Sequence, residues 1–335
     1  MTSIYFLGDC WGEAEERKHR AFAGPSGGVL RSILRQCGVD QRDCTFDNVF
    51  NFRPRGNQTD SLTTSDKRSS VPGYPPIKPG HYLAAEHGIH LQRLQARIDA
   101  AKPSVIVALG NIALWAICRR SGIKKFRGAP LLTFDGQYKV LPTWHPAAVL
   151  RQWNLRPIAF MDIAKAVAES ADPRLIRPRR IIHIAPSLQD IADFYEEYIR
   201  PAPLLSCDIE TKANTITEIG FAPSTDRCLL IPFFSRSGDG NYWSTAADER
   251  AAWEWVRRIC AEKPLLGQNF QYDMQYLSRT VGIGCPRFAG DTMLLHHTLQ
   301  PELGKGLGFL GSIYTSEPSW KFMRTDHSTM KREDD

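Results

Sequence analysis

The sequence predicts an α/β protein of two α/β domains, on three observations. Strand-like and helix-like segments alternate along the chain, which is typical of sheets with helices packed on them. The 335 residues exceed what one ordinary hydrophobic core holds. The composition changes at 171–180, "ADPRLIRPRR", where two prolines and four arginines indicate a linker. We therefore expect one domain over 1–170 and a second over 181–335.

The elements of the first half follow from hydrophobic spacing. Apolar β-branched and aromatic runs predict strands, and apolar residues three and four apart predict helices. Residues 53–80 are rich in Pro, Gly, Ser, Thr and Asn, which predicts a long loop. The expected strands are 4–9, 45–52 and 104–110, the expected helices are 27–38, 88–103, 111–122 and 157–170, and a strand-to-helix corner is expected over 138–151.

The second half shows the same alternation with a different element order. Ser187 and Asp190 have the spacing of a capping box, so a helix is expected to begin there. The expected strands are 181–185, 204–211, 215–222 and 228–234, and helices are expected over 187–199 and 246–262, followed by strand and helix segments within 264–277 and 289–299. The two halves show no internal repeat.

Composition bounds the partners and the compartment. A formal charge of +6 and a pI near 8.9 permit a polyanionic partner. The eight cysteines are scattered without a CxxC pair, which argues against a zinc ribbon or a disulfide framework. We see no signal peptide and no apolar run long enough to span a bilayer, so we expect a cytoplasmic protein (host cytoplasm if phage-encoded) without a membrane partner.

Four residues of the first half carry side chains suited to chemistry on a nucleobase. Asp9 directly follows a strand, Phe22 precedes a Gly-rich turn, Asn48 lies at a strand end, and His145 lies at the strand-to-helix corner. A carboxylate orients water, a phenyl ring stacks on a base, an amide reads a Watson–Crick edge, and a histidine donor stabilises a leaving base. Each residue alone could equally serve the fold, as a cap, a turn residue or part of the core.

The Gly-rich turn adds a candidate phosphate contact. Gly27 and Gly28 open the helix expected from residue 27, and helix N-termini present free N–H groups to anions.

These stretches resemble the uracil-DNA glycosylase superfamily, in particular its thermophile-type branch and the glycosylase-like domains at the N-terminus of some phage DNA polymerases. The matching segments are "GDCWG", "AFAG", "NVFNFRP" and "HPAAVLR", within residues 4–170. The resemblance implies a three-layer α/β/α sandwich. It also implies the site roles: Asp9 positions the water, Phe22 stacks on uracil, Asn48 recognises the base, His145 stabilises the uracil anion, and Arg151 lies near the DNA backbone.

The chain departs from that family pattern in its first loop and in its cysteines. Asp9 replaces the usual Glu, and Trp11 replaces the usual Pro. The thermophile-type enzymes carry four cysteines for an iron–sulfur cluster, whereas here Phe52 stands at one ligand position and the N-terminal CxxC is missing. We therefore expect no iron–sulfur cluster, and no other cofactor, in this domain.

A second constellation suggests metal-binding carboxylates. Asp208 and Glu210 are two apart on a strand, so both side chains point to one face. Side-by-side carboxylates repel unless a cation lies between them, and oxygen ligands suit Mg²⁺ or Mn²⁺. The segment "GQNFQYDMQYL" adds Asn269, Tyr272 and Asp273. Two such metals stabilise the attacking and leaving oxygens of phosphodiester hydrolysis.

This half resembles the 3′–5′ proofreading exonuclease domain of family A DNA polymerases, a ribonuclease-H-like fold of the DEDD type. The resemblance implies that Asp208, Glu210 and Asp273 bind the metals. Asn269 is then expected to contact substrate or brace the site, and Tyr272 to contact substrate. Asp291 is expected to cap its helix. The family's third motif, Y-x-x-x-D, is not found: "FMRTD" places Phe322 four residues before Asp326, and a phenylalanine cannot take a proton. We therefore expect an exonuclease-like domain truncated before that motif.

Taken together, the sequence predicts a DNA-processing enzyme resembling the N-terminal part of a phage DNA polymerase. The first domain is expected to excise uracil or a modified pyrimidine, and the second to carry metal-dependent exonuclease-type chemistry. The expected partners are single-stranded or primer-template DNA and a downstream polymerase domain or subunit. The alternative is a non-catalytic DNA-binding module, whose basic stretches "RRSGIKKFRG" and "RLIRPRR" contact phosphates. A purely structural, partner-binding protein is a third, weaker alternative.

Overall fold

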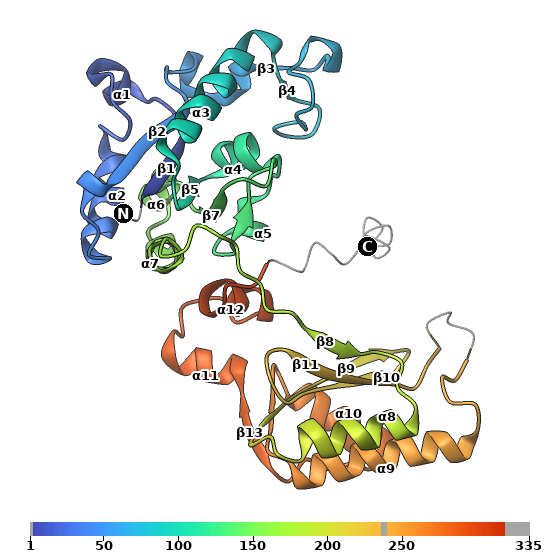
Figure 1. Ribbon diagram of the computed structural model, residues 1–335. Coiled ribbons are helices and arrows are strands. Elements are labelled where there is room, and N and C mark those ends of the chain that lie inside the picture. Colours follow the sequence, from blue (N-terminus) through green and yellow to red (C-terminus); the bar gives the residue numbers. More distant parts are fainter. Residues whose placement is uncertain (1–2, 236–239, 319–335) are drawn as a thin grey trace. The chain divides into compact units, whose positions relative to one another are not determined.

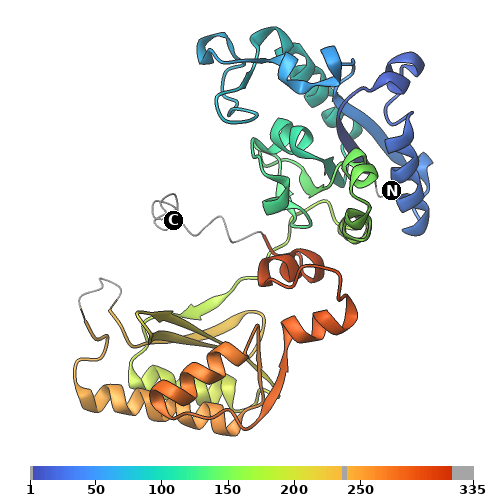
Figure 2. The ribbon, with the colours of Figure 1, turned by 180° about the vertical axis from the view of Figure 1, so that it is seen from behind.

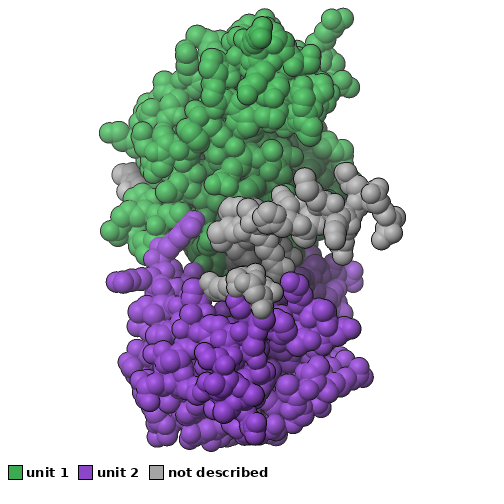
Figure 3. Space-filling view, turned by 90° about the vertical axis from the view of Figure 1, so that its right-hand side faces the viewer, with its two compact units in different colours: residues 1–176, 308–335 green, residues 177–307 purple. Residues whose placement is uncertain are grey.

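The computed structural model describes residues 3–235 and 240–318. The chain forms two compact units (Figures 1, 2 and 3): unit 1 comprises Met1–Ile176 with Gly308–Asp335, and unit 2 comprises Arg177–Leu307. The boundary at 176 and 177 falls inside the predicted linker. The compact unit 2 is shorter than the predicted domain 181–335, because the described residues 308–318 group with unit 1. The division into compact units describes how the chain packs and does not test the domain limits 1–170 and 181–335, which stay predictions.

Unit 1 is built on a five-stranded sheet in the order β2-β1-β5-β7-β6. Strand β1 pairs in parallel with β2 and β5, β5 pairs in parallel with β7, and β6 is antiparallel to β7. The strands are β1 (Ile4–Cys10), β2 (Cys44–Phe50), β5 (Val105–Leu109), β6 (Leu131–Leu132) and β7 (Lys139–Thr143), and the predicted loop 53–80 leads into a small separate pair, β3 (Thr63–Thr64) and β4 (Tyr82–Leu83).

Helices cover both faces of this sheet, because alternate residues of one strand point to opposite sides. Tyr5 and Leu7 enter a core with α3 and α4, whereas Ile4 and Phe6 enter another with α2, α6 and α7. Unit 1 is thus the expected three-layer α/β/α sandwich. Its helices are α1 (Glu13–Lys18), α2 (Pro25–Gln36), α3 (Gly88–Ala101), α4 (Asn111–Cys118), α5 (Ile123–Phe126), α6 (Pro146–Arg151) and α7 (Arg156–Glu169).

Unit 2 contains a six-stranded sheet in the order β13-β12-β9-β10-β11-β8. Strands β9, β10 and β11 are antiparallel neighbours, and the outer pairs β9–β12, β12–β13 and β11–β8 are parallel. The strands are β8 (Ile181–His183), β9 (Leu205–Lys212), β10 (Thr215–Ala222), β11 (Arg227–Pro232), β12 (Leu265–Gly267) and β13 (Phe288–Asp291). Unit 2 is therefore also α/β, as predicted.

Three helices, α8 (Leu188–Phe194), α9 (Ala246–Glu262) and α10 (Gln271–Val281), pack on one face of this sheet (Figure 1). Cys207 and Ile209 of β9 point into that core. A π-helical turn (Tyr195–Ile199) extends α8, and α11 (Thr292–Leu299) follows β13. The capping box predicted from Ser187 and Asp190 begins α8.

The helix α12 (Leu307–Tyr314) and the residues after it are bonded to α7 and to the turn after α5 in unit 1. The ammonium group of Lys165 donates to the carbonyl oxygens of Gly128 (2.9 Å), Thr315 (2.6 Å) and Ser312. The guanidinium of buried Arg127 donates to Ser312 Oγ at 2.7 Å and also binds the buried carboxylate of Asp162. These bonds join a segment that follows unit 2 in sequence to the fold of unit 1.

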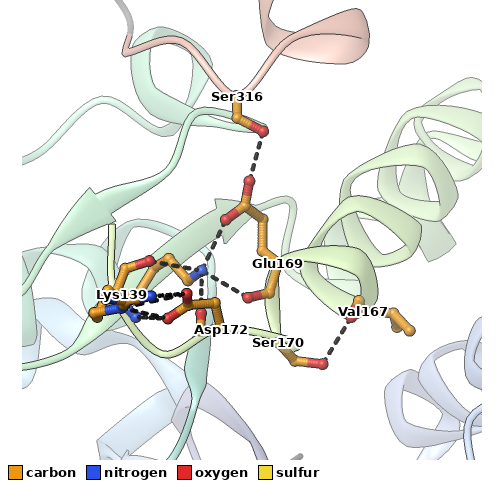
Figure 4. Close-up of polar contacts among 7 residues, drawn as sticks. Lys139, Val167, Glu169, Ser170, Asp172 and Ser316 are labelled. Carbon is orange, nitrogen blue, oxygen red and sulfur yellow. Dashed lines mark hydrogen bonds and ion pairs between the residues drawn. The ribbon is translucent and has the colours of Figure 1, made fainter. Parts of the chain in front are cut away.

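The end of α7 is closed by a buried lysine (Figure 4). Lys139 Nζ donates to the carbonyl oxygens of Glu169 and Asp172, both at 2.6 Å, and to Glu169 Oε2 at 2.8 Å. Ser316 Oγ donates to the other carboxylate oxygen of Glu169 at 2.5 Å. Lys139 thereby satisfies the Glu169 carbonyl, which the end of α7 leaves without a partner inside the helix.

Two further sequence expectations concern the third exonuclease motif and membrane-spanning segments. Phe322 and Asp326, weighed as a degenerate third exonuclease motif, lie outside the described residues. Within the described part of the chain, the helices are all too short or too polar to cross a bilayer.

Candidate active site

Four predicted residues of unit 1 meet at the carboxyl edge of its sheet. Asp9 is the second-last residue of β1, and Asn48 lies on β2 one register position away, opposite Gly8. His145 follows β7 and precedes α6. These three residues and Phe22 line one pocket of about 680 Å³, hereafter the base pocket. Ligands of open α/β sheets bind at this edge, where neighbouring strands connect in opposite directions.

Asp9 is held between its own strand and the start of α4. Its Oδ1 accepts a hydrogen bond from the backbone N–H of Ala113 at 3.2 Å. Burial raises the pKa of the Asp9 carboxyl above its usual value, and the nearby His145 ring and the N–H groups of Ala113 and Ile112 oppose that rise. A carboxylate with a raised pKa at a pocket wall is suited to accepting a proton or orienting a water.

Phe22 occupies a conformation that side chains rarely adopt. Its φ is +53°, in the left-handed region, and Arg31 Nη1 donates to its carbonyl oxygen at 2.8 Å. The ring is buried, and its centroid lies 6.4 Å from that of His145 in a stacked orientation. Such backbone strain persists where the surrounding structure enforces it, commonly at ligand sites.

Asn48 presents a side-chain amide that has no hydrogen-bond partner among the described residues, although the residue is only 2% exposed. Its backbone is fixed: Arg93 Nη2 donates to its carbonyl oxygen at 2.6 Å, and Arg93 Nη1 binds the buried carboxylate of Asp47. An amide in a pocket wall that no protein group bonds is available to a ligand that enters the pocket.

His145 is oriented by the helix that it precedes. Its Nδ1 accepts a hydrogen bond from the backbone N–H of Ala147 at 3.1 Å. Since Nδ1 acts as acceptor, a neutral ring carries its proton on Nε2. The side chain is then a hydrogen-bond donor through Nε2.

The three predicted DNA contacts lie differently. Arg151 lines the base pocket. Gly27 instead lies beneath Phe22, where a Cβ would be 1.8 Å from the Phe22 carbonyl oxygen, and Gly28 is exposed with open space around its Cα. The close approach explains why Gly27 is a glycine. The predicted roles of Gly27, Gly28 and Arg151 toward DNA stay predictions.

Sequence analysis missed part of the pocket wall. Glu15 is 7% exposed, and its two carboxylate oxygens accept from the N–H groups of Gly12 (3.2 Å) and Gly24 (2.8 Å). It thus ties the loop after β1 to the loop that carries Phe22. The segment 57–60, within the predicted long loop, also lines the pocket. The signal that could have indicated Glu15 is its position between two glycine-containing loops. No local signal in the sequence marks the segment 57–60.

In unit 2 the predicted carboxylates do not share one face of the sheet. Asp208 and Glu210 point away from the helices, beside Glu218 of β10, and line a shallow pocket of about 220 Å³. Asp273 is 4% exposed on α10, and its Oδ1 accepts from the backbone N–H of Ile209 at 2.9 Å. Burial raises the pKa of Asp273 to about 6, and the charge of Asp208 adds to the rise.

The other predicted substrate residues surround the start of α10. Asp291 caps α11 by accepting from the N–H of Met293 (2.8 Å), as predicted, and also accepts from the N–H of Asn269 (3.0 Å). Asn269 has a left-handed φ of +57°. The hydroxyl of Tyr272 lies 2.8 Å from Thr211 Oγ1. Their contact with a substrate stays a prediction.

The fit of metals to these residues can be tested from the geometry. Among the described residues, no group of three or more His, Cys, Asp or Glu side chains is placed to hold a metal ion. The carboxylate of Asp273 is bonded to a backbone N–H instead. At the position where the family resemblance implies an iron–sulfur ligand, the Phe52 ring packs 4.8 Å from that of His90. Within the described residues, the predicted ligands are therefore not gathered around one ion.

The sandwich and the base pocket define a class: an α/β/α fold that places a carboxylate, an unpartnered amide and a histidine donor around a space large enough for a nucleobase. The family model described as the uracil DNA glycosylase superfamily matches residues 1–168, and the chain belongs to that superfamily. The resemblance expected from the sequence is thereby confirmed for the first half, and with it the assignment to a class of DNA glycosylases.

Relatives extend the comparison. The Type-4 uracil-DNA glycosylase of Thermotoga maritima is 34% identical over 169 residues, which are 49% of this chain and 76% of that protein. The Type-4 enzyme of Sulfurisphaera tokodaii is 30% identical and is covered to 68%. The DNA polymerase of Bacillus phage SP01 is 22% identical over 318 residues, 84% of this chain, and the match spans 31% of that polymerase.

Solved structures similar to the chain are exonuclease domains. The Aedes aegypti Nibbler exonuclease domain matches 43% of this chain and 74% of its own, with 12% identity and a TM-score of 0.30. The EXD2 exonuclease domain soaked in Mg and dGMP matches 45% and 78%, with 14% identity and a TM-score of 0.27. The polymerase match over both units agrees with the expected fusion of a glycosylase domain and an exonuclease-like domain in a DNA-processing protein.

Proposed function

We propose that unit 1 excises uracil from DNA. The observation that carries the proposal is the Asn48 amide, which lies in the wall of the base pocket without a partner among the described residues. An amide offers one acceptor and one pair of donors. The Watson–Crick edge of uracil offers the complementary N3–H donor and O4 acceptor, so the two groups can form a pair of hydrogen bonds. The Type-4 enzymes named above act on uracil, which supports the same substrate here.

The site residues divide the reaction between them. The uracil base is flipped out of its strand into the base pocket, where its face lies against the Phe22 ring. As the bond from C1′ to N1 breaks, negative charge develops on the base, and the Nε2–H of His145 donates to its O2. The Asp9 carboxylate orients a water whose oxygen bonds to C1′, and the proton that the water loses balances the one that the uracil anion takes up from solvent, leaving an abasic site and free uracil.

The test uses the full chain and a labelled single-stranded oligonucleotide with one internal uracil. The reaction runs in EDTA and is followed by alkaline cleavage at abasic sites. We expect alkali-dependent cutting at the uracil, and a loss of about 100-fold or more in rate with Asn48→Ala, since an unpaired base edge forfeits specific binding. The matched control is Arg68→Ala, an exposed change outside the pocket. Uncut DNA with the intact chain would overturn the proposal and leave the non-catalytic DNA-binding module.

Finer statements about unit 2 and its partners stay predictions. Metal-dependent 3′–5′ exonuclease activity rests on the motif resemblance of Asp208, Glu210 and Asp273, and it is tested by a 3′ ladder that appears with Mg²⁺ or Mn²⁺ and disappears in EDTA. The preference for single-stranded or primer-template DNA, and a polymerase domain or subunit as partner, are likewise proposed from the match to the phage polymerase.

A further inference from the structure

A second hollow of about 300 Å³ shares the Phe22 side chain with the base pocket. We call it the arginine hollow. It is lined by Arg20, Ala21, Phe22, Gly27, Leu30, Arg31, Gln41, Arg42 and Phe46. No residue assigned to base excision other than Phe22 belongs to it, so its composition calls for an explanation of its own.

The floor of the arginine hollow is aromatic and apolar. Leu30 is fully buried and Phe22 nearly so, whereas Phe46 is partly exposed. The ring centroids of Phe22 and Phe46 lie 6.1 Å apart in an edge arrangement, and Phe46 stacks on Phe6 at 5.4 Å. Phe46 is thus held firmly from behind. A rigid, partly exposed ring offers a stacking surface that accepts any base.

The rim is cationic, with three arginines and no carboxylate among the lining residues. Arg31 Nη1 donates a hydrogen bond to the Phe22 carbonyl oxygen (2.8 Å), and Arg42 forms an ion pair with Asp40 (2.6 Å). The guanidinium of Arg20 is exposed and has no partner among the described residues. Arginines above an aromatic floor match the two parts of a nucleotide, a phosphate and a base.

We propose that the arginine hollow holds a nucleotide of the same DNA strand, adjacent to the one whose base enters the base pocket. Flipping one base removes the stacking partner of its neighbour. The neighbouring base then lies on Phe46 while its phosphate is bound by the arginine rim. This inference rests on the proposed function, because it places the neighbour relative to an excised uracil.

The test varies the neighbour and the hollow together. Single-stranded substrates carry one uracil with an abasic tetrahydrofuran residue immediately 5′ or 3′ of it, and are compared with a normal neighbour. Base stacking on an aromatic side chain corresponds to a factor of about 5 to 150 in affinity. For the unaltered chain we expect kcat/KM to fall by about tenfold when one of the two neighbours lacks its base.

Variants locate the effect. Phe46→Leu keeps an apolar floor without the ring and is expected to abolish the sensitivity to the abasic neighbour. Arg20→Ala, an exposed change that leaves the core untouched, is expected to weaken binding and to lower the slope of log affinity against log salt by about 0.7. Arg68→Ala is the matched control and is expected to leave both values unchanged.

Each outcome bears on the inference separately from the proposed function. The inference is overturned if the unaltered chain has the same kcat/KM with either abasic neighbour as with a normal one. It is also overturned if Phe46→Leu still responds to the abasic neighbour and Arg20→Ala leaves the slope of log affinity against log salt unchanged. If the unaltered chain releases no uracil, the proposed function fails, and the same oligonucleotides are compared by fluorescence anisotropy. Affinity that depends on the neighbouring base and on Phe46 then still supports a nucleotide site, and affinity that ignores both overturns it.

Discussion

Replacing Gly8 by alanine tests whether excision depends on the positions of Asn48 and Phe22 in the base pocket. A Cβ at Gly8 would lie 2.3 Å from Asn48 Oδ1 and 2.8 Å from Phe22 Cζ. Ordinary contact needs more than 3.4 Å, so the amide must move by about 1 Å and the ring by somewhat less. Both atoms lie at the far ends of side chains and not on the backbone, so we expect the fold to survive at a cost of about 1–3 kcal/mol in unfolding free energy. A displacement of about 1 Å lowers a rate by about 100-fold.

The assay is single-turnover uracil release from the single-stranded oligonucleotide, with thermal unfolding measured in parallel. Gly88→Ala is the matched control, because its Cβ meets only Val71 at an ordinary 3.5 Å. We expect a rate about 100-fold lower for Gly8→Ala and an unchanged rate for the control. A Gly8→Ala protein that is folded and excises uracil at the full rate would refute the placement of Asn48 and Phe22 in the reaction.

Four further predictions concern His145, Asp9 and the segment after residue 306. His145→Gln is expected to lower the excision rate by about 100- to 1,000-fold with little change in KM, since the donor acts on charge that develops in the transition state; equal losses in kcat and substrate affinity would contradict this. Because burial raises the pKa of Asp9, excision is expected to rise with pH through a pKa above that of an ordinary aspartate. At a pH above this raised pKa, the buried ionised carboxylate lowers the stability of the fold. Asp9→Asn is therefore expected to raise Tm at neutral pH while abolishing excision, and a lowered Tm would contradict this prediction. Ending the chain at residue 306 removes the carbonyl oxygens of Ser312 and Thr315 that accept from Lys165. This change is expected to lower the unfolding free energy of unit 1 by about 2–4 kcal/mol, measured by urea denaturation. Unchanged stability would show that the segment is dispensable.

The sandwich of unit 1 was predictable because its signals are local. Hydrophobic spacing located the main strands and helices, and the corner at His145 followed from a proline placed where a helix begins. Helix 111–122 was predicted too long: it ends at Cys118, because Arg119 adopts a left-handed conformation that closes the helix. The spacing of apolar residues carries no information about such a backbone change.

Contacts between distant segments escaped the sequence. Arg93 fixes the backbone at Asn48 from α3, and Lys165 binds carbonyl groups about 150 residues further along the chain. Neither pairing has a local pattern. In unit 2, the strand spacing correctly placed Asp208 and Glu210 on one face of β9. The bond from the Ile209 N–H to Asp273 joins β9 to α10 across 64 residues, and no local motif reports it.

The most direct test of the account is uracil release by the full chain in EDTA, compared between the unaltered protein and Asn48→Ala on one single-stranded oligonucleotide. The account predicts alkali-dependent cutting at the uracil alone, reduced by about 100-fold in the variant, with both proteins folded to the same Tm within a few degrees. Equal cutting by the two proteins would contradict the role of the Asn48 amide. DNA that is bound and left uncut by the unaltered protein would contradict the glycosylase itself.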